Sequence, residues 1–275
     1  MPLTPLISAA LLPLFLQTAA QGTTPDLPVP SSQTAMSSPA TIERDRLTVC
    51  LEEARQDPAT AIVTASTWLA EVVGPERSYP QQCLGMAYTS LLRWQAAEDS
   101  FMMARNARLE DNHLSRAKLA AMAGNAALAD NRLEDALGTL DLALRDAALT
   151  GDPMVSGGIE VDRARTLVGL GRMDEARQAL ATARQDAAQN SEAWLLSATL
   201  SRREDRLEDA QMQIRTAAGL APQDPRIGLE AGVIAMLAGD SEAARASWES
   251  VIALDSDSEQ AATARTYLSQ MKETP

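Results

Sequence analysis

Few side chains in this 275-residue chain are of the types that carry out covalent or metal chemistry. His113 is the only histidine, and Cys50 and Cys83 are the only cysteines. These three residues do not provide the ligand number or spacing of a tetrahedral metal site. A serine triad would depend on His113 alone, and no nucleophile-elbow sequence presents a serine. We therefore expect neither a catalytic centre nor a bound metal.

Glycine patterns that bind phosphates are also missing. No glycine-rich loop ends in Gly-Lys-Ser or Gly-Lys-Thr. The segment Gly169-Leu170-Gly171 lacks the third glycine of a dinucleotide-binding loop, so we interpret it as a turn between helices. Acidic pairs such as Glu134-Asp135 and Glu208-Asp209 stand at expected helix starts, where they complement the helix dipole. We interpret them as solvated faces and expect no cofactor.

The elements that position these residues are predicted to be helices. Hydrophobic residues make up 45% of the chain but aromatic residues only 3%, so a core must consist mainly of alanine and leucine. Apolar residues recur every three or four positions from Thr41 onward, and no segment alternates as a β-strand does. The formal net charge of −13 argues against nucleic-acid binding, which depends on clustered Lys and Arg. The sequence predicts an all-α protein.

The first forty residues differ from the rest. Residues 1–20 carry no charge and contain an apolar run from Leu6 to Leu16, followed by the small residues Thr18-Ala19-Ala20. This pattern is typical of a signal peptide cleaved near Ala20, although no basic residue precedes the run. A plain tail and a membrane anchor are the alternatives, and the run is too short to cross a hydrocarbon core of about 30 Å. Residues 21–40 are rich in Pro, Ser and Thr, which predicts a disordered linker.

A short motif recurs along the remainder of the chain. It consists of a turn, a helix start and an alanine, and these alanines are Ala97, Ala136, Ala176, Ala210 and Ala244. They follow one another at intervals of 39, 40, 34 and 34 residues. Repetition with this period indicates stacked supersecondary units. We interpret the longer early intervals as the same unit with insertions between repeats, one of them the glycine-rich stretch 150–158.

In this register the chain resembles the tetratricopeptide repeat (TPR) family, whose unit is a helix-turn-helix of 34 residues. The fifth unit carries the resemblance best, because six family positions match at Trp194, Ala198, Ala210, Ile214, Ala217 and Pro222. The resemblance implies a right-handed α-solenoid of about six units over residues 41–256, with approximate bounds 42–77, 78–111, 117–150, 157–190, 191–224 and 225–256. A capping helix and tail are expected over 257–275. The first unit matches least, since Ala65 stands where a bulky residue is usual.

The residue types of the repeat also have a physical reason. Small residues such as Gly85 and Ala164 let two antiparallel helices approach closely, while Phe101, Leu140 and Leu180 fill the space between successive hairpins. A single hairpin cannot bury its apolar face alone. Stacked neighbours therefore form a continuous core.

The resemblance also brings the two cysteines together. Cys50 and Cys83 are about one repeat apart, and the first helices of neighbouring units lie side by side in TPR proteins. If the chain is exported, we expect a disulfide that stabilises the fold by about 3–4 kcal/mol in the chain-entropy model. The alternative, expected without export, is two small buried residues that are not bonded.

The resemblance implies a binding groove as well. In the family, outward positions on the first helix of each unit line a concave groove that receives a partner segment. Carried over to this chain, these positions are Gln82, Met86, Thr89, Lys118, Asn125, Arg165, Thr199, Arg202, Arg203, Arg226 and Val233. Because five of them are basic, one hypothesis is that the groove accepts an acidic segment or a terminal carboxylate, which arginine binds bidentately. The alternative is an ordinary polar face.

These observations predict a non-enzymatic scaffold or adaptor in the bacterial periplasm, with another protein or a peptide segment as partner. We expect no nucleic-acid partner and no stable membrane insertion after signal cleavage. The alternative is a self-associating structural component of a cell-envelope assembly that acts through the terminal helix near Tyr267 and Leu268. Self-association predicts a concentration-dependent mass, whereas an adaptor is expected to be monomeric. The sequence leaves the partner's identity and the oligomeric state open.

Overall fold

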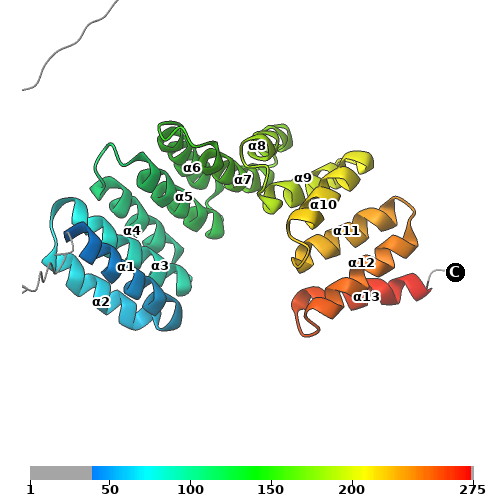
Figure 1. Ribbon diagram of the computed structural model, residues 1–275, viewed down its shortest axis with the longest axis horizontal. Helices are drawn as coiled ribbons and strands as arrows, with labels where there is room; N and C mark the ends of the chain where they lie inside the picture. The colour runs from blue at the N-terminus through cyan, green and yellow to red at the C-terminus, as the bar shows by residue number, and fades with distance from the viewer. Residues whose placement is uncertain (1–38, 274–275) are drawn as a thin grey trace, which may run out of the picture. The chain divides into compact units, whose positions relative to one another are not determined.

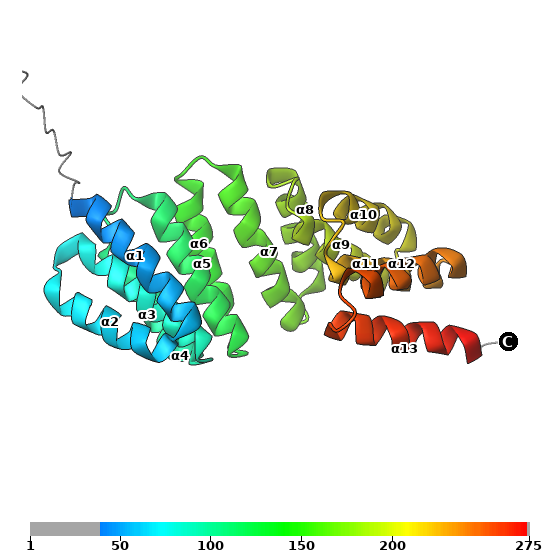
Figure 2. The same cartoon turned by 60° about the horizontal axis from the view of Figure 1, so that its bottom comes forward.

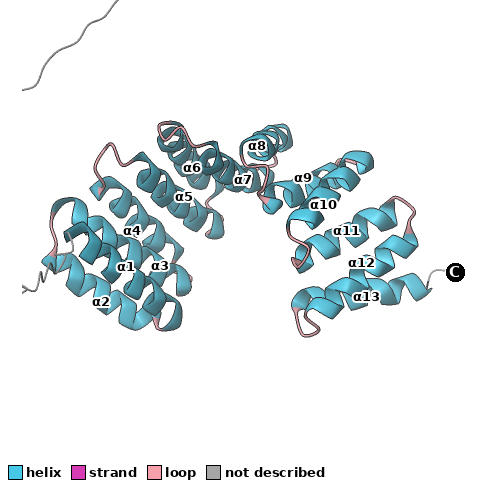
Figure 3. Cartoon of the chain, viewed as in Figure 1, coloured by secondary structure: helices cyan, strands magenta, loops and turns pink. Residues whose placement is uncertain are grey.

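The computed structural model describes residues 39–273, and the regular elements within that range are all helical (Figure 3). They comprise thirteen α-helices and one short 3-10 helix. In chain order they are α1 (Pro39–Gln56), α2 (Pro58–Glu71), η1 (Gly74–Arg77), α3 (Ser78–Ser90), α4 (Trp94–Ala107), α5 (His113–Ala129), α6 (Leu133–Ala148), α7 (Pro153–Gly169), α8 (Met173–Asp186), α9 (Ser191–Arg203), α10 (Leu207–Leu220), α11 (Pro225–Leu237), α12 (Ser241–Leu254) and α13 (Glu259–Glu273). The predicted signal peptide and residues 21–38 of the predicted linker lie outside the described residues, and Pro39 and Ala40 already belong to α1.

The described helices pair in sequence into hairpins that pack on one another in chain order (Figures 1 and 2). The hairpins are α3–α4, α5–α6, α7–α8, α9–α10 and α11–α12, and the second helix of each also packs on the first helix of the next. First helices of successive hairpins touch as well, as α7 touches α9 and α9 touches α11. This arrangement is the all-α solenoid that the repeats predicted. None of the helices in the described range is both long and apolar enough to span a membrane.

The turn inside each hairpin has the same backbone conformation. The residues at these turns have positive φ, from 56° at Leu92 to 84° at Gly239, and the others are Asn131, Gly171 and Asp205. The next N–H bonds to the carbonyl five residues earlier, as in Arg172 N to Leu167 O at 2.9 Å, which is the Schellman arrangement. Each of these positive-φ residues stands five positions before one of the repeat alanines, as Leu92 does before Ala97. The interpretation of Gly169-Leu170-Gly171 as an inter-helix turn is confirmed.

The glycine-rich stretch 150–158 corrects one prediction. It is not an insertion between repeats, because α7 begins at Pro153 and only three of these residues connect helices. The Asp152 side chain caps α7 by accepting a hydrogen bond from Met154 N at 3.0 Å, and proline suits the first helical position. The longer repeats have longer helices instead: α5, α6 and α7 have 17, 16 and 17 residues, whereas α9, α10, α11 and α12 have 13 or 14.

Small residues meet large ones inside each hairpin, as the repeat predicted. A Cβ atom added to Gly85 would lie 2.5 Å from the Phe101 ring, and one added to Gly124 would lie 2.7 Å from Leu140 Cγ. Phe101 and Leu140 are 2% and 0% exposed, so neither ring nor methyl groups have free space to retreat into. These close approaches fix the distance between the two helices of a hairpin, and with it the position of each first helix.

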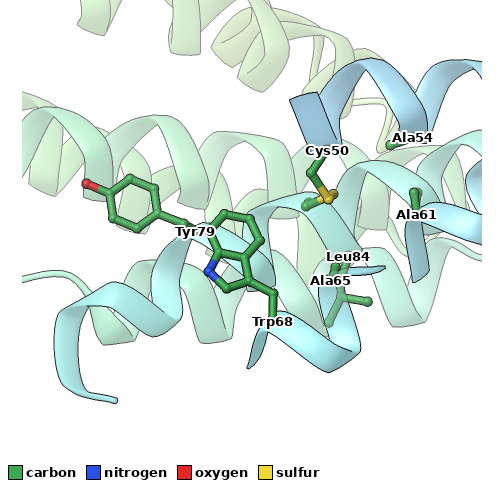
Figure 4. Packing of buried hydrophobic residues seen from close by; sticks show 9 residues of the cluster. Cys50, Ala54, Ala61, Ala65, Trp68, Tyr79 and Leu84 are labelled. Atoms are coloured by element: carbon green, nitrogen blue, oxygen red, sulfur yellow. A yellow bond between two sulfur atoms is a disulfide. The ribbon is translucent and has the colours of Figure 1, made fainter. Parts of the chain in front are cut away.

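The first three helices share a core that includes the two cysteines (Figure 4). Trp68 on α2 is 1% exposed and supplies the bulk that Ala65 does not, and its indole N–H donates to Glu43 Oε2 at 2.6 Å. Cys50 on α1 and Cys83 on α3 form a disulfide pair in the structure, with their Cα atoms 6.0 Å apart. The predicted pairing is therefore met by the geometry.

Helix α13 covers the last hairpin, packing on α11 and α12. Ala261 and Ala264 on α13 are fully buried, and the Tyr267 ring centroid lies 5.0 Å from that of Trp248. Tyr267 and Leu268 are half-buried against the same core. The apolar face of α13 is thus used in capping the last repeat.

Candidate functional site

The face formed by the first helices of successive hairpins carries two adjoining cavities. Side chains of α7, α9, α11 and α13 reach this face, and α7, α9 and α11 are each held in place by the turn of their own hairpin. We call the two cavities together the first-helix groove.

The first cavity lies between α7 and α9 and has a volume of about 200 Å³. It is lined mainly by apolar side chains, with polar groups at Arg165, Thr199 and Arg203. The apolar lining consists of Ala164, Val168, Leu180, Leu196 and Leu200.

The second cavity lies among α9, α11 and α13 and has a volume of about 370 Å³. Leu196 and Thr199 line both cavities, so the two adjoin at these residues. The remaining lining comes from Glu192, Leu195, Arg226, Leu229, Glu230, Val233, Gln260 and Tyr267. The cap helix α13 therefore contributes to the groove as a further first helix would.

Carboxylates neutralise most of the arginines in this groove. Arg165 pairs with Asp162 on its own helix and with Glu192 on α9, where Nη2 and Oε1 are 2.7 Å apart. Glu192 also accepts from Arg226 on α11, again at 2.7 Å. These contacts tie three successive first helices together by charge-assisted hydrogen bonds.

A second interhelix pair lies beside this chain of charges. Arg202 Nε on α9 donates to Glu230 Oε1 on α11 at 2.6 Å, and Arg202 Nη2 donates to Glu230 Oε2 at 3.2 Å. Helix α5 contributes a further contact to α7, because Asn125 Nδ2 on α5 donates to Asp162 Oδ2 on α7 at 2.8 Å. Burial raises the pKa of Asp162, while the hydrogen bonds from Asn125 and Arg165 oppose that rise.

The groove is consequently less basic than the sequence hypothesis required. Three of the five predicted cations, Arg165, Arg202 and Arg226, are paired within the chain. Lys118 and Arg203 are exposed and have no ion pair among the described residues. The hypothesis rested on the cations alone. Their partners on neighbouring helices, Glu192 and Glu230, lie about one repeat away along the chain, so the sequence of one helix does not show them.

The structure brings some of the predicted groove residues together and leaves others apart. Arg165, Thr199 and Arg203 line the first cavity, and Thr199, Arg226 and Val233 line the second. Gln82, Met86, Thr89, Lys118, Asn125 and Arg202 line neither; Met86 packs into the core clusters of the first hairpins, and Thr89 Oγ1 donates to Gly85 O within α3. Sequence reasoning missed Val168, Leu196, Leu229 and Tyr267. Val168, Leu196 and Leu229 stand three positions from the predicted residues Arg165, Thr199 and Arg226 on the same helices, whereas α13 carries no predicted groove residue near Tyr267.

The predicted absence of a metal site can be compared with the structure over residues 39–273. His113 is the first residue of α5, and its Nδ1 is buried without a hydrogen-bond partner. No group of three or more His, Cys, Asp and Glu side chains that could hold a metal ion occurs in the described range.

Comparison with solved structures identifies the type of fold. No protein-family model matches the sequence, and no curated protein matches it. Among solved structures, PilW, described as a widely conserved type IV pilus biogenesis factor, is 19% identical with a TM-score of 0.65, covering 81% of this chain and 97% of its own. PilF from Pseudomonas aeruginosa is 15% identical with a TM-score of 0.64, covering 82% and 97%. BtubC from P. vanneervenii is 16% identical with a TM-score of 0.60, covering 75% and 91%. Together with the hairpin stack, these similarities show a TPR-type fold.

Proposed function

We propose that this chain is a non-enzymatic interaction scaffold whose first-helix groove binds a segment of a partner protein. The observation that carries the proposal is the pair of adjoining cavities along α7, α9, α11 and α13, of which the first has a mainly apolar lining and the second combines apolar and polar side chains. Concave sites with an apolar floor and a few placed polar groups are the usual form of ligand sites.

The proposed partner segment is one that inserts apolar side chains into the two cavities. The first cavity, at about 200 Å³, has room for an aliphatic or aromatic side chain, and Leu196 and Thr199 separate it from the second. The carboxylates that pair with Arg165 and Arg226 remove the need for an acidic partner. Exposed Arg203, at the rim of the first cavity, remains as the cation available to an acidic residue beside the apolar anchor.

The test is a peptide-display selection against the whole protein, followed by binding measurements with Thr199→Arg. This substitution puts a long side chain at the wall shared by both cavities. Thr216→Arg on α10 is the matched control, because both threonine hydroxyls donate to the carbonyl four residues earlier at 3.1 Å. We expect selected peptides to lose affinity by about tenfold or more with Thr199→Arg and to keep it with Thr216→Arg. Equal affinity for both variants would refute the groove as the site.

We propose that the scaffold acts after export, in the bacterial periplasm. The Cys50–Cys83 disulfide supports this location, since disulfides persist in oxidising compartments and are rare in the cytosol. The uncharged leading sequence supports it as well. The pilus-factor description of PilW is compatible with an envelope role but shows only fold similarity here. An intact mass that starts near Gln21 and includes a closed disulfide is the expected result; a chain from Met1 with two free thiols would contradict export.

A second candidate function is self-association, which one observation at the other end of the stack favours. A cavity of about 420 Å³ between α1 and α2 is bordered by exposed Ile42 and Val49, which are 48% and 70% accessible. This surface offers more exposed apolar area for stacking than α13, where Tyr267 and Leu268 are half-buried. Analytical ultracentrifugation over a range of concentrations decides the point: association that Val49→Lys abolishes would favour this function, and a constant monomer mass would exclude it.

A further inference from the structure

A third cavity, of about 300 Å³, lies on the side of α9 away from the groove, among α8, α9 and α10, and we call it the rear cavity. Ser197 and Ser201 of α9 line it; each is two residues from Thr199, which places them roughly 200° around the helix from the groove wall. Leu180 on α8 and Leu200 on α9 line both the rear cavity and the first cavity of the groove. The junction between the hairpins α7–α8 and α9–α10 therefore has open space on two sides of these leucines.

The other contacts between α8 and α9 are made by small or polar side chains. Ala183 of α8 and Ala193 of α9 are fully buried in one small core cluster, and Arg184 Nη1 donates to Ser197 Oγ. The α4–α5 junction differs, because the Phe101 ring of α4 packs in one cluster with side chains of α5. Side chains that border a cavity lack contacts on one side, so dispersion forces hold the α8–α9 junction less firmly than a filled one.

An ion pair joins α8 and α9 at the end opposite their connection. The four residues 187–190 connect the end of α8 to the start of α9, whereas Arg177 lies near the start of α8 and Glu204 follows the end of α9. Arg177 Nη2 donates to Glu204 Oε1 at 2.7 Å, and Arg177 Nε donates to Glu204 Oε2 at 3.2 Å. The Arg165–Glu192 pair also crosses this junction, but Glu192 is the second residue of α9 and lies beside the connection.

We propose that the α8–α9 junction is a hinge, at which the hairpins α7–α8 and α9–α10 rotate about Leu180 and Leu200 and the Arg177–Glu204 ion pair latches the closed form. Hinge motion about a short connection is a common form of conformational change. The two cavities lie on opposite sides of this pivot, so a rotation that widens one narrows the other. The rotation thereby changes the width of the first-helix groove. This inference concerns the free chain and does not depend on the partner proposed for the groove.

The test measures distances between pairs of spin labels in the full chain by double electron–electron resonance. Gly138→Cys on α6 and Gly219→Cys on α10 place labels across the junction, and a Cβ atom added at either glycine has no atom within 4 Å. The control pairs are Gly138→Cys with Gln185→Cys on α8, and Gly219→Cys with Glu249→Cys on α12, at exposed positions that do not span the α8–α9 junction. The two native cysteines are bonded to each other and take no label. We expect a wider distribution of distances across the junction than in either control pair.

The latch is tested by Glu204→Gln in the same labelled chain. The matched control is Glu175→Gln, because Glu175 accepts two hydrogen bonds from Arg172 within a single hairpin, both at 2.7 Å. Glu204→Gln should raise the population of the open distances by about two- to fivefold, which is the effect of losing a partly exposed ion pair. Glu175→Gln should leave that population unchanged.

Two results would overturn the proposal. One is a distribution across the junction that is no wider than those of the control pairs, and the other is an unchanged population of open distances in Glu204→Gln. If Glu204→Gln does not fold, as judged by circular dichroism, the comparison of the three label pairs in the otherwise unaltered chain still decides the proposal.

Discussion

Removing the Cys50–Cys83 disulfide should destabilise one end of the stack selectively. Cys50→Ala combined with Cys83→Ala opens a loop of 33 residues that includes all of α2 and η1. The chain-entropy relation gives about 12–13 cal/mol/K for a loop of this length, which is about 3.7 kcal/mol at 25 °C. Alanine is chosen because both positions are at most 2% exposed and a serine hydroxyl there would need a buried partner.

The loss should remain local, because each repeat contacts only its neighbours and stability is close to a sum over repeats and their interfaces. Hydrogen exchange followed by mass spectrometry measures this directly. Amides of α1 and α2 should lose protection by up to about 500-fold, since each 1.36 kcal/mol is a factor of ten, while amides of α9 and α10 should be unaffected. Reducing agent should reproduce the pattern in the wild-type protein. An equal loss over all helices, or no loss in α1 and α2, would refute this reasoning.

Three further changes test the packing and the charges. Gly232→Ala should lower the free energy of unfolding by about 1–3 kcal/mol, because the new methyl group overlaps the Trp248 indole. Gly219→Ala has no atom within 4 Å of the new Cβ, so it should leave the free energy of unfolding unchanged or raise it by up to about 1 kcal/mol. Urea unfolding compares the two variants, and equal effects would contradict the close approach of helix and indole as the cause. Burial raises the pKa of Glu160, so the folded chain holds the proton of this carboxyl more tightly than the unfolded chain does, and this contribution to stability is lost as pH rises through the folded pKa. Glu160→Gln should therefore be more stable than wild type at about pH 7 and equally stable near about pH 4. A stability difference that does not change with pH would count against a raised pKa at Glu160. Asp146→Ala should lower the free energy of unfolding by about 3–5 kcal/mol, because it removes the carboxylate that lies 2.7 Å from the buried guanidinium of Arg105 in the wild-type protein. A loss below about 1 kcal/mol in thermal unfolding would show that this ion pair is dispensable.

The sequence predicted those parts of the fold that depend on local pattern. The turns around Gly171 and the pairing of Gly85 with Phe101 follow from residues within one hairpin, and both are present. The stretch 150–158 was misassigned because Gly157 is helical where α7 approaches Ala187 at the end of α8, a contact that no local pattern reveals. Glycine serves there as a spacer between helices.

The candidate site was less predictable for the same reason. Repeat positions located Arg165 and Thr199 on the face that carries the two cavities, but the cavities arise between hairpins, so the contribution of Tyr267 became evident only when α9, α11 and α13 were placed together. The charge of the groove depends on partners about one repeat away, such as Glu192 for Arg165. Composition along one helix cannot show such pairing.

The central claim is that the first-helix groove holds a partner segment, and site-specific photocrosslinking in the native host tests it most directly. A photoreactive side chain at Thr199 would face both cavities, and one at Thr216 on α10 serves as the control. We predict one reproducible protein adduct from Thr199, identified by mass spectrometry and absent from Thr216. Adducts that form equally at both positions, or crosslinks from Thr199 only to a second copy of this chain, would contradict it.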